Sequence, residues 1–555
     1  MTVTHEVFNQ PPPLAGHDVA QDPALLEALD REGGAAVVPE LHELGQLAAT
    51  EATQERARLA NECPPRLLTH DRFGHRIDEV EFHPAWHELM SVAVSHGVHA
   101  APWAASAADA GAGHLTRAAK FYVWGQAEAG HMCPISMTYA ALPALAHQPE
   151  LAAQFGPLLT SRVYDPGLRV PTAKAGLLAG MAMTEKQGGS DVRAGTTRAV
   201  PAPSLGDGVH LLTGHKWFNS APMCDLFLVL AQAPGGLTCF LLPRVLPDGS
   251  RNAVRFQRLK DKLGNRSNAS AEVEYDEAFA WQVGAAGRGV RTIIDMVSAT
   301  RLDCVVGGAS GMRRAVVAAV HHCDGRETFG RKLVDHPLMA TVLADLVIES
   351  EAATTLAIRL AGAAQRAIDG DAGQAAHSEA ALLRVALPAA KYWVCKRAVV
   401  HAGEALECYG GNGFVEESGM PRLYREAPLN SIWEGSGNVT SLDVLRAMAR
   451  EPASVQALFG EIELAAGADR RLDAAVAALK DSLADTATIE PRARRVAEQI
   501  ALTLQGSLLV RYGKPAIADA FCASRLGGDW GHAFGTLPAG LELAAIIERA
   551  RPQAT

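Results

Sequence analysis

The stretch Met183-Thr184-Glu185-Lys186-Gln187-Gly188-Gly189-Ser190-Asp191 lies where the pattern of the sequence changes. Before it, from Asp22 to about Ala175, apolar residues recur at i, i+3 and i+4, which predicts helices. After it, as far as Val283, short runs with a period of two alternate with turn residues, which predicts strands. The two adjacent glycines would let the backbone approach a ligand closely, and the flanking hydroxyls can donate hydrogen bonds. By itself the stretch also fits an ordinary turn between two domains.

The remaining segments complete the order of the domains. The first 20 or so residues are expected to form an extended arm, because Pro11-Pro12-Pro13 cannot continue a helix. From Arg291 onward the helical period returns, and long segments separated by glycine-containing breaks predict an antiparallel bundle. We therefore predict a multidomain α+β protein with four parts: a helical domain with its arm over 1–175, a β-domain over 176–290, a helical bundle over 291–445 and a helical extension over 446–555.

Composition limits the class of protein. The 555 residues are 48% apolar and 20% charged, which is typical of a soluble globular protein. Residues 446–555 carry 13 basic and 13 acidic side chains, so the net charge of −10 belongs to the remainder, and a polyanion site is expected in or near this neutral tail. Nine dispersed cysteines without a CxxC pair favour a reducing compartment and no metal site. Neither a secretory signal nor a transmembrane run is found, so we expect a cytoplasmic protein.

Three further stretches carry possible ligand chemistry. Gly214-His215-Lys216-Trp217-Phe218-Asn219-Ser220 places aromatic rings beside small polar residues, which could bound a planar ring or simply belong to a core. Arg326-Glu327-Thr328-Phe329-Gly330 offers an arginine for a diphosphate, and it also fits a solvated charged loop. Gly410-Gly411-Asn412-Gly413 is a glycine-rich turn that would allow close approach to phosphate or ribose.

Glu434 is the candidate for acid–base chemistry. It lies between Trp433 and Gly435 in the stretch Ile432–Asn438. A carboxylate desolvated by an aromatic ring has a raised pKa and can act as a general base. A glutamate considered alone is more often a surface residue near a helix end.

Together these stretches resemble the acyl-CoA dehydrogenase superfamily over about residues 80–445. The pattern comprises Thr184-Glu185 through Ser190-Asp191, then Gly214-x-Lys216-x-Phe218, then Arg326-x-x-Phe329-Gly330, and finally the glycine turn with Glu434-Gly435-Ser436 downstream. The whole chain is similar to the AidB-type, adaptive-response group of flavoproteins linked to DNA alkylation. The resemblance implies the acyl-CoA dehydrogenase fold, with an N-terminal helical domain, a small β-barrel-like domain and a four-helix bundle, followed here by the helical extension. It also implies FAD as cofactor, an acyl-CoA ligand and a homotetramer.

The resemblance assigns roles to individual residues. Glu434 matches the catalytic base, which removes a proton from an acyl thioester. Ser436, Gly437-Asn438 and Lys186-Gln187 depart from the pattern of working dehydrogenases, so we expect only weak, isovaleryl-CoA-like turnover. The residues expected to bind FAD are Met183, Thr184, Glu185, Gly188, Gly189, Ser190, Asp191, Trp217, Phe218, Asn219, Ser220, Arg326, Phe329, Trp433, Gly435, Ser436 and Asn438.

In this group the helical extension is the proposed surface for double-stranded DNA. The basic residues expected to contact DNA are Arg446, Arg450, Arg494, Arg495, Arg511, Lys514 and Arg525. No helix-turn-helix or zinc motif is found, so binding should be directed at the phosphate backbone and depend strongly on salt. The same charges also fit solvated helix faces with ion pairs.

We therefore expect a stress-response flavoprotein that binds duplex DNA and acts in the response to alkylation damage. The alternative is an ordinary metabolic dehydrogenase of short or branched acyl-CoA, with the extension serving oligomerisation. Direct flavin-dependent dealkylation of a base is the least supported, since no path for an extruded base is evident in the sequence.

Overall fold

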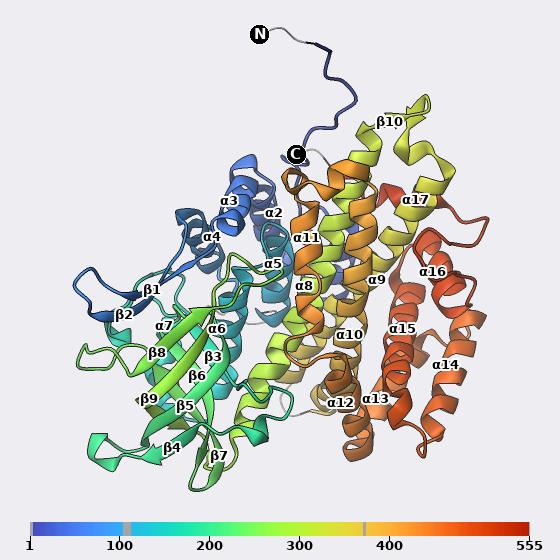
Figure 1. The fold of residues 1–555 in the computed structure, drawn as a ribbon. Coiled ribbons are helices and arrows are strands. Elements are labelled where there is room, and N and C mark those ends of the chain that lie inside the picture. The colour runs from blue at the N-terminus through green and yellow to red at the C-terminus, as the bar shows by residue number, and fades with distance from the viewer. Residues whose placement is uncertain (1–3, 104–112, 370–372, 554–555) are drawn as a thin grey trace. The chain divides into compact units, whose positions relative to one another are not determined.

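A computed structural model describes residues 4–103, 113–369 and 373–553, and the chain divides into two compact units. The mixed unit comprises residues 52–113 and 128–303, and the helical unit comprises residues 1–51, 114–127 and 304–555. The long helix α8 (Gly289–Gly325) begins in the first unit and ends in the second. Figure 1 shows the elements of both units.

Besides the start of α8, the described residues of the mixed unit form four α-helices and a hairpin beside its main sheet. The helices are α3 (Glu51–Glu62), α4 (Pro84–Ser95), α6 (Met132–Leu145) and α7 (Pro149–Leu159). The hairpin of β1 (Arg66–His70) and β2 (Arg76–Glu81) lies in a region for which the sequence predicts only helices. Arg76–Glu81 reads Arg-Ile-Asp-Glu-Val-Glu, so its two apolar residues stand three apart and lack the period of two that predicts a strand, and the short run sits between two strong helical segments. The periodicity of its neighbours therefore hides it.

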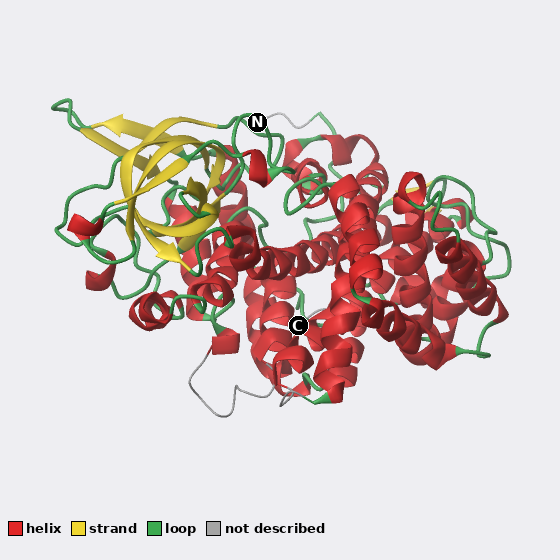
Figure 2. Ribbon diagram, turned by 90° about the horizontal axis from the view of Figure 1, so that it is seen from below, coloured by secondary structure: helices red, strands yellow, loops and turns green. Residues whose placement is uncertain are grey.

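The main sheet of the mixed unit closes into a small barrel. Its strands are β3 (Ala179–Ala182), β4 (Arg198–Pro201), β5 (Val209–Ser220), β6 (Leu226–Ala233), β7 (Gly236–Pro243), β8 (Val254–Leu259) and β9 (Ser270–Val283). The order is β3-β6-β4-β5-β9-β7, and β6 also pairs with β7, which closes the ring. Closure leaves few unpaired strand edges. Figure 2 shows the strands curling around one another, as predicted for this region.

The bundle of the helical unit is built on long helices, two of which, α9 (Pro337–Asp369) and α10 (Gln374–Glu407), run side by side (Figure 1). They join the second half of α8, the N-terminal helices α1 (Pro23–Glu32) and α2 (Val38–Ala48), and α5 (Gly113–Gly125). The tight hairpin of β10 (Glu327–Thr328) and β11 (Arg331–Lys332) connects α8 to α9. The short helix α11 (Met420–Glu426) and then α12 (Gly437–Arg450) follow α10.

The extension continues the bundle without forming a unit of its own. It contains α13 (Pro452–Ile462), α14 (Arg470–Ala484), α15 (Ala493–Tyr512), α16 (Pro515–Phe521) and α17 (Leu543–Glu548). Phe521 and Ile546 are fully buried in one apolar cluster with residues of α8 and α9, and Leu14 of the arm joins the same cluster. Removing the extension would therefore expose the core of the bundle to water.

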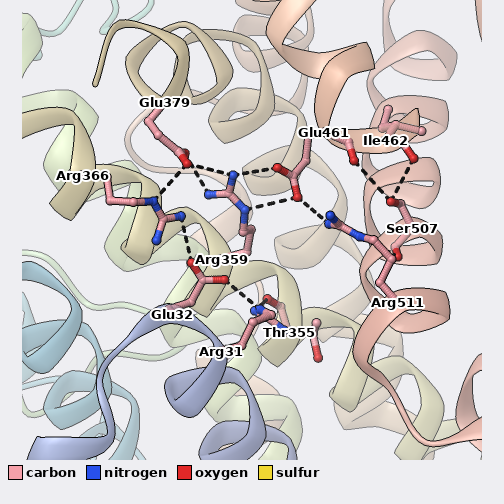
Figure 3. Close-up of polar contacts among 10 residues, drawn as sticks. All are labelled: Arg31, Glu32, Thr355, Arg359, Arg366, Glu379, Glu461, Ile462, Ser507 and Arg511. Carbon is pink, nitrogen blue, oxygen red and sulfur yellow. Dashed lines mark hydrogen bonds and ion pairs between the residues drawn. The ribbon is translucent and has the colours of Figure 1, made fainter. Parts of the chain in front are cut away.

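A network of buried ion pairs also ties the extension to the bundle (Figure 3). Arg359 of α9 lies 2.9 Å from Glu379 of α10 and 2.7 Å from Glu461 of α13. Glu461 also accepts a hydrogen bond from Arg511 of α15. Burial would raise the pKa of Glu461, but the hydrogen bonds from Arg359 and Arg511 outweigh it and lower the pKa to about 2. Arg366 extends the network to Glu32 of α1, at 2.9 Å.

The predicted order of helical, β, helical and further helical segments is confirmed. Segments 291–445 and 446–555, predicted as two domains, pack here as one unit that also includes the N-terminal helices. Among the described residues no helix is long and apolar enough to cross a membrane. No group of three or more His, Cys, Asp or Glu side chains in the described parts of the chain could hold a metal ion.

Candidate functional site

The loop Met183–Asp191 follows β3 directly and is fastened to β5. The backbone N–H of Trp217 donates to the carbonyl of Thr184 at 2.9 Å. Gly189 is required there, because a Cβ at this position would lie 2.5 Å from Thr184 Oγ1. Gly188 has φ +147, a conformation that favours glycine. The structure thus brings two of the predicted stretches, 183–191 and 214–220, together in the barrel.

Glu185 is buried and supports this loop from inside. Its carboxylate lies 2.9 Å from Lys216 Nζ, and each side chain is 1% exposed. It also accepts hydrogen bonds from the backbone N–H of Thr196 at 2.6 Å and of Thr197 at 3.1 Å. Burial would raise the pKa of Glu185, but the hydrogen bonds from Lys216 and Thr196 hold it well below its usual range. The expectation that Glu185 contacts the cofactor is corrected: its oxygens are engaged by the barrel itself.

The end of β5 carries an aromatic shelf, formed by Trp217 and Phe218. Lys260 Nζ lies 3.3 Å from the centre of the Trp217 ring and 4.7 Å from that of Phe218, and it pairs with Glu272 at 2.6 Å. Phe218 is 47% exposed, so part of its ring is open to a ligand. Asn219 is 1% exposed, and its Oδ1 has no hydrogen-bond partner among the described residues. An exposed ring beside a buried acceptor suits a flat ligand that carries donor groups.

The remaining polar residues of these stretches stay at the surface of the loop or the strand end. Ser220 is half-buried, and Ser190 and Asp191 are exposed. Ser220 Oγ lies 3.2 Å from Ser270 Oγ of β9. Their hydroxyl and carboxylate groups can therefore hydrogen-bond a ligand that approaches this face of the barrel.

In the helical unit, Arg326 directly precedes the β10–β11 hairpin, and Phe329 lies in its turn. Glu327 pairs with Lys332 and Thr328 with Arg331, so Phe329 and Gly330 form the turn, with φ +51 and +79. Two consecutive positive φ values define the type I′ turn that matches the twist of a hairpin. Phe329 is 98% exposed. Arg326 has no carboxylate ion-pair partner within the described residues, which leaves its charge available to an anion.

The loop around Glu434 is held by a lysine that the sequence analysis did not single out. Lys391 of α10 is 1% exposed, and its Nζ donates to the carbonyl oxygen of Trp433 at 2.6 Å and to that of Gly435. Glu434 has φ +55 and Gly435 φ +101, so the backbone turns sharply at the candidate base. A non-glycine residue in this conformation is strained unless its surroundings fix it, and strain of this kind concentrates at functional positions. Lys391 anchors both carbonyls that flank Glu434.

This loop runs directly into α12. Ser436 is the N-cap residue, and Asn438 lies in the first turn. The Asn438 side-chain oxygen accepts a hydrogen bond from Arg494 Nε of α15 at 2.8 Å. The stretch with the candidate base is therefore connected to the extension through a residue predicted to contact DNA.

The predicted DNA contacts separate into exposed and buried residues. Arg446, Arg450, Arg494 and Arg495 are exposed at the end of α12 and the start of α15. Lys514 is 59% exposed and lies 3.3 Å from Glu27.

Two of those predictions are wrong as surface contacts. The Arg525 side chain is 0% exposed and pairs with Asp345 at 2.5 Å and Glu349 at 3.0 Å. The Arg511 side chain is 11% exposed and pairs with Glu461. Arg525 holds the extension against α9, and Arg511 holds α15 against α13 within the extension, so neither side chain is open to phosphate while these pairs persist.

Three family models match this chain in order. The AidB N-terminal domain matches residues 9–166, the middle domain of the acyl-CoA dehydrogenases matches 180–278, and their C-terminal domain matches 287–449. The match to the middle domain falls on the barrel, and the match to the C-terminal domain runs from α8 to α12.

Relatives match along nearly the whole chain. The AidB protein of Escherichia coli (strain K12) is 46% identical over 524 residues, which cover 94% of each chain. Acyl-CoA dehydrogenase family member 11 of Caenorhabditis elegans is 31% identical over 545 residues, covering 91% of this chain and 85% of the relative. The crystal structure of ACDH-11 of Caenorhabditis elegans in complex with C11-CoA superposes with a TM-score of 0.85 at 26% identity, covering 100% of this chain and 94% of that one. This protein therefore belongs to the acyl-CoA dehydrogenase family, in the branch defined by the AidB N-terminal domain.

Proposed function

We propose that this protein binds FAD and an acyl-CoA, retains weak dehydrogenase activity toward short branched acyl-CoA, and binds double-stranded DNA in the response to alkylation damage. The observation that carries the enzymatic part is the Glu434 loop. It presents one carboxylate on a strained turn whose two flanking carbonyls are fixed by buried Lys391. Such fixing is what a general base requires to meet a substrate proton in one orientation.

Each unit carries side chains whose chemistry suits a part of FAD. The exposed Phe218 ring and the unpartnered Asn219 Oδ1 suit a flat ring with N–H donors, and the loop with Gly188 and Gly189 leaves backbone free for close approach. Arg326 suits a diphosphate. When bound, FAD supplies the acceptor for the hydride that leaves the acyl β-carbon. Glu434 takes the α-proton of the thioester, and Trp433, Gly435, Ser436 and Asn438 shape the loop that carries it.

Residues at one end of the helical unit support a homotetramer. Four large apolar residues there are more than three-quarters exposed: Phe329 (98%), Phe414 (85%), Leu338 (83%) and Phe8 (76%). The arm residue Asn9 binds the Phe329 hairpin, and His336, two residues before Leu338, binds Thr328 of that hairpin. A group of large exposed apolar side chains on a soluble protein marks an interface. Another copy of the chain would cover it.

The DNA part of the proposal rests on the exposed arginines Arg446, Arg450, Arg494 and Arg495. Two of them are four residues apart at the end of α12, and the other two are adjacent at the start of α15. Each phosphate contact contributes to a steep dependence of affinity on salt.

One experiment tests both parts. Purified protein loaded with FAD is mixed with isovaleryl-CoA while the flavin absorbance is recorded, and the same sample is titrated with duplex DNA at several salt concentrations. Bleaching that is lost in Glu434→Gln supports the enzymatic part. The DNA-binding part is supported if the double variant Arg446→Ala/Arg450→Ala binds duplex DNA more weakly and with a shallower dependence on salt. A protein that takes up no FAD refutes the first part, and an absence of duplex binding at low salt refutes the second.

The alternative function is an ordinary metabolic acyl-CoA dehydrogenase. The burial of Arg511 and Arg525 favours it, since Arg525 joins the extension to α9 and Arg511 pairs with Glu461 inside the extension, so neither adds to a basic surface. Rapid turnover of a short acyl-CoA together with no DNA binding would establish it.

A further inference from the structure

The N-terminal arm is fixed on the β10–β11 hairpin by one residue, Asn9. Its Nδ2 donates to the carbonyl oxygen of Glu327 at 2.8 Å, and its Oδ1 accepts from the backbone N–H of Glu327 at 2.7 Å. The side-chain amide thus satisfies both backbone groups of Glu327, as a neighbouring strand would. Asn9 is half-buried, whereas the other described residues from Thr4 to Gln10 are exposed.

The backbone of Asn9 holds Arg326. Arg326 Nη1 donates to the Asn9 carbonyl oxygen at 2.7 Å. Asn9 itself has φ +56, a left-handed conformation that asparagine tolerates better than most residues. The turn at Asn9 therefore directs its side chain and its carbonyl to two neighbouring residues of the hairpin at once.

Further contacts hold the arm in place beyond Asn9. His321 Nε2 lies 2.9 Å from the carbonyl oxygen of Pro12. A Cβ on Gly325 would lie 3.0 Å from Pro11, so the arm passes close over the end of α8. Leu14 is buried in the apolar core of the helical unit. On the other side, Asn412 Nδ2 lies 3.4 Å from Gln10 Oε1, which connects the arm to the glycine turn after α10.

We propose that Asn9 is a positioning residue for the diphosphate of FAD, acting through Arg326. This inference rests on the proposed FAD site and adds to it a part of the chain outside the acyl-CoA dehydrogenase motifs. An arginine side chain has about 2 kcal/mol of rotamer entropy to lose when it is ordered. The bond to Asn9 orders the guanidinium before any ligand arrives, and it uses only Nη1, which leaves the other donors for phosphate oxygens.

The test separates the side chain of Asn9 from its backbone conformation. Asn9→Gly keeps the left-handed φ without strain and removes both side-chain hydrogen bonds to Glu327. We expect it to weaken FAD binding about tenfold, because an arm released from Glu327 no longer holds the Asn9 carbonyl against Arg326, and part of the ordering of the guanidinium must then occur on binding. His5→Ala, on the exposed part of the same arm, is the matched control and should bind FAD as the wild type does.

A double-mutant cycle with Arg326→Ala distinguishes positioning from a general loss of structure. If Asn9 acts through Arg326, adding Asn9→Gly to Arg326→Ala should change FAD affinity less than twofold. Hydrogen exchange of residues 326–332 in the FAD-free protein should become faster in Asn9→Gly and remain unchanged in His5→Ala.

The possible failures are distinct. FAD affinity of Asn9→Gly equal to that of the wild type, or an equal loss in the Arg326→Ala background, overturns the role of Asn9 while the FAD site stands. A wild-type protein that takes up no FAD overturns the proposed function itself.

Discussion

Replacing Arg525 with alanine should destabilise the protein by about 3 kcal/mol without removing any surface charge. The Arg525 side chain is 0% exposed and lies 2.5 Å from Asp345 and 3.0 Å from Glu349, which are themselves 0% and 1% exposed. Removing one member of a buried ion pair costs about 3–5 kcal/mol, because its partner stays buried without compensation. Here the lower value applies. Glu349 keeps Arg397 at 3.0 Å, and Asp345 keeps the N–H of Gly535 at 2.9 Å.

Urea unfolding followed by tryptophan fluorescence measures this loss, since the Arg525 guanidinium stacks 4.3 Å from the ring centre of Trp530. Arg450→Ala is the matched control: it removes an exposed arginine, and its free energy of unfolding should stay within about 0.5 kcal/mol of the wild type. Adding Asp345→Asn to Arg525→Ala should recover part of the loss, because Asp345 is the carboxylate left without a cationic partner, whereas Glu349 keeps Arg397.

The result bears on how DNA binding is interpreted. We expect any loss of DNA affinity in Arg525→Ala to accompany a loss of stability, whereas Arg446→Ala/Arg450→Ala should lose affinity at unchanged stability. Arg525→Ala with wild-type stability and a reduced salt dependence of DNA binding would refute the reasoning, since it would show that this arginine meets phosphate directly.

Three further predictions concern other buried groups. Lys216→Met should cost about 3 kcal/mol in urea unfolding by leaving Glu185 uncompensated, and the double variant with Glu185→Gln should be more stable than Lys216→Met alone; equal stability of the two variants would contradict the pairing. Lys391→Met should cost about 1–3 kcal/mol and speed hydrogen exchange over residues 431–436, because two carbonyls lose their donor; unchanged exchange there would show that the loop does not need this lysine. Burial lowers the pKa of His401 to about 4, so the folded state keeps it neutral where the unfolded state is protonated, and stability should fall as the pH drops from about 6.5 to 4. His401→Gln should flatten this dependence in urea unfolding at pH 7 and 5, whereas the exposed control His75→Gln should leave it intact.

Much of the fold could be predicted from the sequence because its periodicities are long. The helices α9 and α10 each exceed 30 residues, and the barrel strands lie between clear turn residues such as Asp207-Gly208. The β1–β2 hairpin was missed because Arg76–Glu81 does not alternate, its two apolar residues being three apart, and helical segments lie on both sides of the hairpin. The merging of the extension with the bundle was missed for another reason. Local patterns predict helices, but they do not predict which helices share a core.

The motifs of the candidate site could be predicted from the sequence, but the residues that hold these motifs in place could not. Glu434 and Phe218 stand in recognisable stretches, whereas Lys391 lies 43 residues before Glu434 in an apolar helix and Asn9 lies over 300 residues before Arg326. The one sign of Lys391 in the sequence is that it stands within the apolar run 385–395, where a buried lysine must find hydrogen-bond acceptors. The burial of Arg525 could not be predicted from the sequence, because its carboxylate partners Asp345 and Glu349 lie about 180 residues away.

The ion pairs of Glu461 restrict how this chain can recombine with its relatives. Glu461 lies between Arg359, encoded well upstream, and Arg511, encoded downstream. A chimaera joined near the end of α12 would bring a foreign residue opposite Arg359, and unless that residue were acidic, Arg359 would keep only Glu379 as its buried counter-charge. Exchange of the last hundred residues between homologues should therefore be tolerated best when the incoming segment carries an acidic residue at the position of Glu461.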